Sequence, residues 1–167
     1  MIRSHLMIAA LSAIMVAGAR ADDATDCLDA HNRIRKARGL EPLRLDKRLC
    51  DAAQAHAKYM AGRLKLDHQG ADKQMYFDRA QAAGYPTDWV NSSENIAEGP
   101  AEFMDAAFTT QAWLESKVGH KDNVLSREWR DFGVGVARGS DGRLYWCAVY
   151  ARSTPSPRDP PRQLQYE

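Results

Sequence analysis

Histidines are the side chains of this sequence best suited to chemistry, because imidazole exchanges protons near neutral pH and binds divalent metals. His31 and His56 fall on the apolar stripes of expected helices, which favours packed, hydrogen-bonded core residues. His68 and His120 lie outside such stripes, each close to a glycine. Histidines in turns are the better candidates for a metal site or for proton transfer. Lone loop histidines are also common, so spacing alone assigns them no role.

Two polar clusters accompany the histidines. Asp67-His68-Gln69 lies in a polar, turn-like segment, and Ser93-Glu94-Asn95 lies at an expected loop-to-strand transition. A carboxylate at such a transition either caps the backbone or faces a cleft. Both interpretations of Glu94 stay open on these grounds.

A hydrolase is the alternative chemistry. Ser116 and His120 are one helical turn apart, and Asp122 is nearby. However, Gly119 is expected to break that helix, and neither an oxyanion turn nor a strained nucleophile elbow accompanies the serine. The sequence also has no HExxH, CxxC, Gly-x-Ser-x-Gly or phosphate-binding glycine loop.

The chain has three cysteines: Cys27, Cys50 and Cys147. The first two are expected in separate helices and the third in a strand, so at most one disulfide is predicted. The sequence does not choose among the three pairings. None of the thiols stands beside a histidine, which argues against a cysteine nucleophile.

The elements that must position these side chains follow from hydrophobic periodicity. Helical spacing predicts helices over residues 22–38, from the cap Asp46 to about residue 61, over 74–83, and from Gly99-Pro100 to about Ser116. A brief strand is predicted at 95–97, and period-two alternation predicts a hairpin of 132–136 with 144–150. This order of elements is typical of one α+β domain.

Residues 1–21 have the basic start, the apolar run over 6–18 and the A-x-A site of a secretory signal peptide. That run is too short to span a hydrocarbon core about 30 Å thick, so no transmembrane segment is expected after cleavage. The predicted organisation is a signal peptide over 1–21, a domain over 22–152 and a proline-rich tail over 153–167. The protein is therefore expected to be secreted or periplasmic.

Composition narrows the class of protein further. A chain of 167 residues with 44% hydrophobic and 27% charged residues has the size for one domain with a core. Its mean hydropathy of -0.54 argues against a multispanning membrane protein. The formal charge of +1 becomes -1 once Arg3 and Arg20 are removed with the signal peptide. No basic excess remains, so no nucleic-acid partner is expected.

Several sequence blocks follow one another in a fixed order along residues 27–151. They are the helical run 30–61, Asp67-His68, and the segments 77–85, 93–99, 113–125, 132–137 and Tyr145-Trp146. This series resembles the CAP superfamily of cysteine-rich secretory, venom-allergen and plant pathogenesis-related proteins. It is most similar to the bacterial secreted, single-domain branch, also described as SCP-domain proteins.

The resemblance implies an α+β fold, namely an α-β-α sandwich with a small antiparallel sheet between helical layers. It also implies that His68, Glu94 and His120 converge on a central cleft, where several relatives bind zinc or another divalent metal. Glu94 would be a ligand, or would orient water or an imidazole. Ser116 takes the place of a second family glutamate, while Glu115 lies one position early, and both are assigned to the cleft.

This sequence departs from the family pattern in two further ways. Ser93 replaces the usual glycine before Glu94, and the segment 113–120 is one residue longer than in common bacterial members. Together with the missing second glutamate, these changes argue against a full four-residue site and tight metal binding.

The function implied by the resemblance is a secreted, non-enzymatic binding module. Its cleft would take a divalent metal and a small or lipidic ligand. One alternative is a cell-surface interaction module with a vestigial cleft and a cell-envelope or host protein as partner. The other is a metal- or histidine-dependent hydrolase or peptidase.

Overall fold

The computed structural model describes residues 21–153 of the chain. The predicted signal peptide up to residue 20 and the predicted tail from residue 154 lie outside these residues. The elements, in chain order, are α1 (Ala21–Lys36), β1 (Arg44–Leu45), α2 (Lys47–Arg63), the 3₁₀ turn η1 (Ala71–Lys73), α3 (Tyr76–Ala82), β2 (Ser92–Pro100), α4 (Ala106–Glu115), α5 (His120–Leu125), β3 (Asp131–Arg138) and β4 (Arg143–Ala151). Among the helices of the described region, none combines the length and apolar character needed to cross a bilayer.

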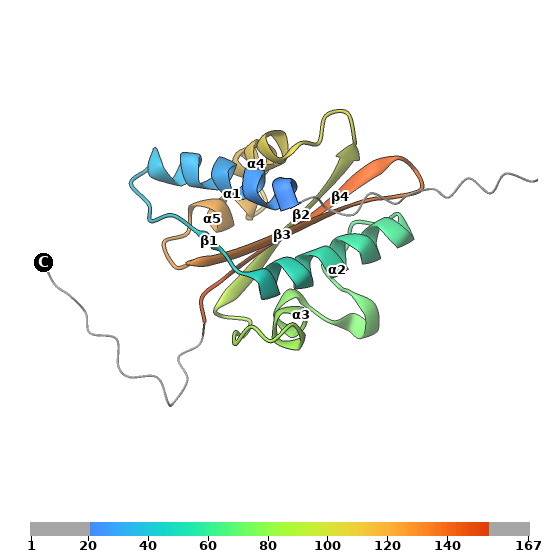
Figure 1. The fold of residues 1–167 in the computed structure, drawn as a ribbon, viewed down its shortest axis with the longest axis horizontal. Coiled ribbons are helices and arrows are strands. Elements are labelled where there is room, and N and C mark those ends of the chain that lie inside the picture. Colours follow the sequence, from blue (N-terminus) through green and yellow to red (C-terminus); the bar gives the residue numbers. More distant parts are fainter. Residues whose placement is uncertain (1–20, 154–167) are drawn as a thin grey trace, which may run out of the picture.

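The domain is an α-β-α sandwich, which confirms the expected fold class. Helices α1, α4 and α5 cover one face of the sheet, and α2 and α3 cover the other (Figure 1). Side chains of β4 alternate between two cores, because successive residues of a strand point to opposite faces. Trp146, Ala148 and Tyr150 pack toward α1 and α4, whereas Cys147 and Val149 pack toward α2.

The four described strands form one sheet in the order β1-β3-β4-β2. The predicted hairpin of β3 and β4 is confirmed, and β2 pairs antiparallel with β4 along its whole length. Only the two-residue β1 runs parallel to its neighbour, through Arg44↔Asp131 and Leu45↔Phe132. The sheet is therefore mixed, with antiparallel pairing throughout its larger part.

The expected helix start at Gly99-Pro100 is wrong. Strand β2 runs over Ser92–Pro100, well beyond the predicted 95–97, because β4 supplies a partner for each of its residues. Pro100 ends an edge strand, where a missing N–H is tolerated. Helix α4 begins later, where the Asp105 carboxylate accepts a hydrogen bond from the Phe108 N–H at 2.7 Å.

Helix α2 lies directly on β3 because two glycines remove the side chains between them. A Cβ built on Gly133 would lie 2.2 Å from the Leu49 carbonyl carbon, and one on Gly135 would lie 2.3 Å from the Gln54 Cα. The Gln54 side chain also bonds Val136, donating to its carbonyl at 3.0 Å and accepting from its N–H at 3.1 Å. The backbones of α2 and β3 are thus in direct contact.

All three cysteines are free thiols. Cys27 and Cys147 are buried, and Cys50 is partly buried. Burial raises the pKa of Cys27 to about 12. The thiols therefore behave as small core residues.

His31 and His56 are both buried, which confirms the expectation that they are core residues. Nδ1 of His31 donates to the Cys27 carbonyl at 2.8 Å, so Nε2 accepts from the Tyr150 hydroxyl at 2.8 Å. Burial lowers the pKa of His31 from 6.5 to about 4. The ring is therefore neutral in the folded domain.

This buried ring makes stability depend on pH. The folded-state pKa lies below the unfolded value, so the unfolded chain binds the proton first as the pH falls. The stabilisation is complete above pH 6.5 and is lost toward pH 4. When the pH falls from 7 to 5, protonation of His31 in the unfolded chain should lower the free energy of unfolding by about 2 kcal/mol. Urea unfolding of wild type and His31→Gln at both pH values measures it. Equal acid losses in the two proteins would contradict the assignment.

Candidate functional site

Strand β2 presents two neighbouring polar side chains to opposite faces of the sheet. Glu94 points toward α2 and α3, where it meets His56, Arg79 and Cys147. Asn95 points toward α1 and α5 and donates to the Tyr150 hydroxyl at 3.1 Å. Because successive residues of a strand point to opposite faces, β2 contributes a polar side chain to each face of the sheet.

The Glu94 carboxylate is fully buried and every oxygen has a partner. Oε1 accepts from His68 Nδ1 at 2.9 Å, and Oε2 accepts from Arg79 Nη2 at 2.5 Å and from Cys147 Sγ at 3.2 Å. Burial raises the pKa of this carboxyl, but the hydrogen bond from His68 and the charge of Arg79 outweigh it. The pKa of Glu94 is therefore below its ordinary value, and the group is a buried carboxylate anion.

His68 is held by this anion at the protein surface. Its side chain is 46% exposed although Glu94 is not exposed at all. Because a carboxylate only accepts, Nδ1 of His68 carries a proton, and Nε2 has a lone pair whenever the ring is neutral. A carboxylate behind an imidazole is the usual way in which proteins orient a metal-binding histidine.

His120 is the first residue of α5. Gly119 precedes it with φ +90°, a conformation that suits glycine and ends the helical path from α4. The His120 carbonyl accepts from Asn95 Nδ2 at 3.1 Å. Burial and the nearby charge of His68 both lower the pKa of His120. The structure joins His68 to Glu94, whereas His120 contacts β2 through its backbone carbonyl and Asn95, whose side chain lies on the opposite face of the sheet from Glu94.

The donor set fits a metal only in part. Two imidazoles are ligands that zinc prefers. Glu94, however, is fully buried, and its oxygens already accept hydrogen bonds from His68, Arg79 and Cys147. Within residues 21–153, no group of three or more His, Cys, Asp or Glu side chains is placed to hold a metal ion. The feature that fits a metal ligand is thus the ring of His68, with Glu94 behind it.

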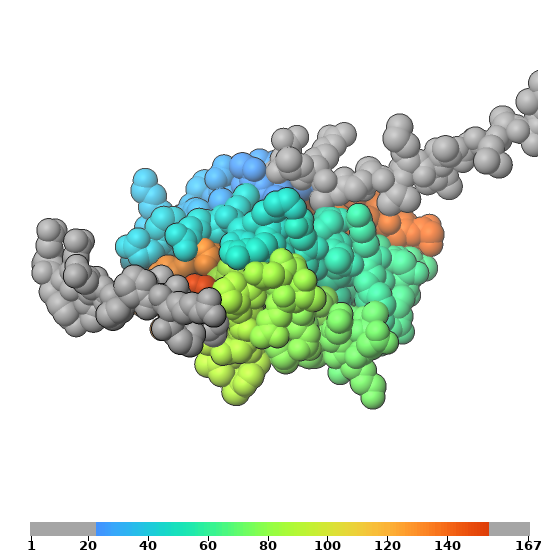
Figure 2. Space-filling view, turned by 60° about the horizontal axis from the view of Figure 1, so that its bottom comes forward, coloured from blue at the N-terminus to red at the C-terminus, as the bar shows by residue number. Residues whose placement is uncertain are grey.

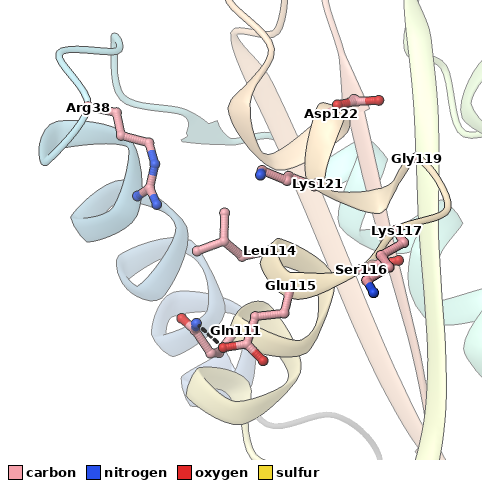
Figure 3. Close-up of a pocket in the computed structure, with 9 residues that line it drawn as sticks. All are labelled: Arg38, Gln111, Leu114, Glu115, Ser116, Lys117, Gly119, Lys121 and Asp122. Atoms are coloured by element: carbon pink, nitrogen blue, oxygen red, sulfur yellow. Dashed lines mark hydrogen bonds between the residues drawn. The ribbon is translucent and has the colours of Figure 1, made fainter.

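Glu115 and Ser116 lie around a different hollow, between the C-terminal ends of α1 and α4 and the start of α5 (Figure 3). This hollow of about 640 Å³ is lined by neither His68 nor Glu94. Glu115 Oε1 accepts from Gln111 at 2.7 Å, and Ser116 Oγ accepts from the Val118 N–H at 3.3 Å. The structure does not place these two side chains at the Glu94 carboxylate.

The same hollow bears on the hydrolase alternative. Asp122 lines it together with Ser116, but Gly119 interrupts the helix between Ser116 and His120, as expected. The Ser116 hydroxyl serves the turn that follows α4. Among residues 21–153, the hydrogen bond of Ser116 Oγ is with the backbone of Val118 and not with a base.

Arg79 is the site residue that the sequence analysis missed. Its guanidinium is buried, and besides Glu94 it bonds the carbonyls of His68 at 3.1 Å and Gln74 at 2.7 Å. It therefore fixes both the carboxylate and the turn that carries His68. A single sequence gives no sign that this arginine, in a short helix, is buried.

Comparisons with known proteins agree with this architecture. Residues 28–150 match the model of the family described as "CAP: Cysteine-rich secretory protein family". Pathogenesis-related protein 1A from Nicotiana tabacum is 32% identical over 92 residues, which cover 55% of this chain and 44% of the tobacco protein. The match thus spans less than half of the length of that relative.

Solved structures show the same fold. An extracellular protein containing an SCP domain from Bacillus anthracis is 25% identical with a TM-score of 0.66, over 79% of this chain and 41% of that one. NaASP2, solved with Zn2+, has a TM-score of 0.57 at 15% identity, over 81% of this chain and 82% of that one. At this sequence identity, the similarity to NaASP2 concerns the fold alone.

Proposed function

This chain belongs to the cysteine-rich secretory protein (CAP) family, and we propose that it is a secreted, non-enzymatic binding module. Its proposed site consists of His68, His120 and the carboxylate of Glu94. The observation that carries the proposal is the bond from His68 Nδ1 to the buried Glu94 at 2.9 Å. This bond orients the His68 ring and, when the ring is neutral, leaves its Nε2 lone pair for a ligand.

The proposed ligand set for a divalent metal is His68 and His120, with Glu94 orienting His68 from behind. Zinc suits imidazole nitrogen, and water or a bound molecule would complete its coordination. A metal held in this way would supply a Lewis-acidic point for an oxygen or nitrogen of a small or lipidic ligand. The zinc in the NaASP2 structure supports this choice of metal.

Zinc is expected to stabilise the domain over residues 22–152 through these two histidines. At a concentration 100 times its dissociation constant, a ligand of the native state adds about 2.7 kcal/mol of stability. The thermal midpoint should therefore rise with added zinc in the wild type and not in the His68→Ala/His120→Ala variant. Gln69→Ala, which alters an exposed neighbour of His68, is the matched control and should respond like the wild type. The same response in all three proteins would overturn the metal site.

A further inference from the structure

The turn between α3 and β2 exposes two adjacent apolar side chains. Trp89 is 69% exposed and Val90 is 54% exposed, whereas the other three tryptophans of the chain are buried. Figure 2 shows the turn in yellow-green, where it projects from the face on which α2 and α3 lie. Tryptophan is among the residues that contribute most to binding at protein interfaces. An exposed tryptophan beside a second apolar side chain therefore indicates an interaction surface.

Hydrogen bonds hold this turn in its conformation. The Asp88 carboxylate accepts from the backbone N–H groups of Val90 at 3.0 Å and of Asn91 at 2.8 Å. The Thr87 hydroxyl donates to the Asn91 carbonyl at 3.0 Å. Trp89 is thus presented by a turn that is already ordered, which lowers the entropy lost when a partner binds.

The chain leaves the described domain beside the same turn. The Arg152 N–H donates to the Asn91 carbonyl at 2.9 Å, and Arg152 Nε donates to Asn91 Oδ1 at 2.6 Å. The described residues end at 153, and the sequence that follows has prolines at positions 155, 157, 160 and 161. A chain can span about 3.3–3.6 Å per residue, so these prolines are tethered within reach of Trp89.

Proline and tryptophan are suited to bind each other. Several recognition domains bind proline-rich segments with aromatic side chains at their surface, and the fixed φ of proline lowers the entropy lost on binding. A short tether raises the effective concentration of two partners to the millimolar range. A contact that is weak between separate molecules is therefore populated when both partners belong to one chain.

We propose that the turn of Trp89 and Val90 binds the proline-rich segment over residues 154–161 of the same chain. The pyrrolidine rings of that segment pack on the exposed indole and shield it from solvent. This interaction goes beyond the proposed metal site, since it involves neither histidine of that site.

Replacing the prolines tests the partner. The chain over residues 22–167 is compared with a variant that carries Pro155→Ser, Pro157→Ser, Pro160→Ser and Pro161→Ser. Acrylamide quenching of tryptophan fluorescence reports mainly Trp89, because the other three indoles are buried. The quenching constant should be about twofold higher in the proline variant, as for a millimolar contact that the tether keeps half occupied. Equal quenching in the two proteins would overturn the proposal.

Arg158→Ser/Arg162→Ser is the matched control in the same tail. It keeps every proline and removes the two arginines, which are the competing partners for an indole ring. Its quenching constant should equal that of the wild type. Quenching that rises in this variant and not in the proline variant would assign the contact to arginine and overturn the proposal.

Paired variants of the domain test the location. In NMR spectra of the chain over residues 22–167, Trp89→Ser should move the backbone amide signals of residues 154–159. Phe103→Ser replaces another exposed aromatic side chain and should leave these signals unchanged. Tail signals that are the same in wild type and Trp89→Ser would overturn the docking site.

Two further conditions keep the outcome unambiguous. The tail signals should not depend on protein concentration, and a dependence would place the segment on a second copy of the chain and overturn the proposal. All measurements are made without zinc, so their failure and that of the metal site are distinguishable.

Discussion

Replacing Arg79 by methionine is expected to lower the free energy of unfolding by about 3–5 kcal/mol, because it leaves the Glu94 carboxylate buried without its cation. The methionine keeps most of the volume, so the loss reports the charge and the hydrogen bonds to Glu94, His68 and Gln74. Urea unfolding at pH 7 measures the change. Adding Glu94→Gln to Arg79→Met removes the unpaired charge and should recover part of the stability.

Arg143→Met is the matched control. Arg143 Nε also lies 2.5 Å from a glutamate oxygen, that of Glu98, but both side chains are about one third exposed. Exposed pairs contribute roughly 0–1 kcal/mol, so this variant should lose little stability. Similar losses of unfolding free energy for Arg79→Met and Arg143→Met would show that the buried Arg79–Glu94 pair contributes no more to stability than the exposed pair.

Adding one methyl group to β3 is expected to have the second large effect. In Gly135→Ala the new Cβ would lie 2.3 Å from the Gln54 Cα, and that neighbour is helix backbone, which cannot rotate away. Helix α2 must shift from the sheet, and we expect a loss of about 3 kcal/mol, the upper end for overpacked cores. Denaturant unfolding measures the loss.

Gly62→Ala separates this contact from any general effect of replacing glycine. Gly62 lies in α2, and a Cβ there meets no atom within 4 Å. Alanine favours a helix over glycine by up to about 1 kcal/mol, so the control should be neutral or stabilising. If Gly135→Ala did not lower the free energy of unfolding, the close backbone contact between α2 and β3 would not be needed for stability.

The sequence predicted the elements whose periodicity is strong. Asp46 caps α2 as expected, with its carboxylate accepting from the Arg48 N–H at 2.9 Å, and the β3–β4 hairpin has the expected place. Pro100 does not by itself distinguish a helix start from a strand end, because proline is acceptable both in the first turn of a helix and at the end of an edge strand. Only the pairing partner distinguishes the two, and β4 lies more than forty residues further along the chain.

Less of the candidate site than of the fold could be predicted from the sequence. Residue types single out His68 and Glu94 as candidates, but only the family resemblance implies that they converge, because nothing in a separation of 26 residues predicts a hydrogen bond between them. The hydrogen-bond partners of Glu94 come from α3, β4 and the loop between α2 and η1, and the burial of Arg79 follows from how these segments pack. The roles of His68, His120 and Glu94 in binding, and those of Glu115 and Ser116, stay predictions.

The free thiols have a consequence for how the protein matures. A disulfide typically contributes about 2–4 kcal/mol by restricting the unfolded chain, and this domain has no such restraint among Cys27, Cys50 and Cys147. Its two cores and its buried polar network must therefore provide the whole stability. Folding of the described domain therefore requires no disulfide between these cysteines.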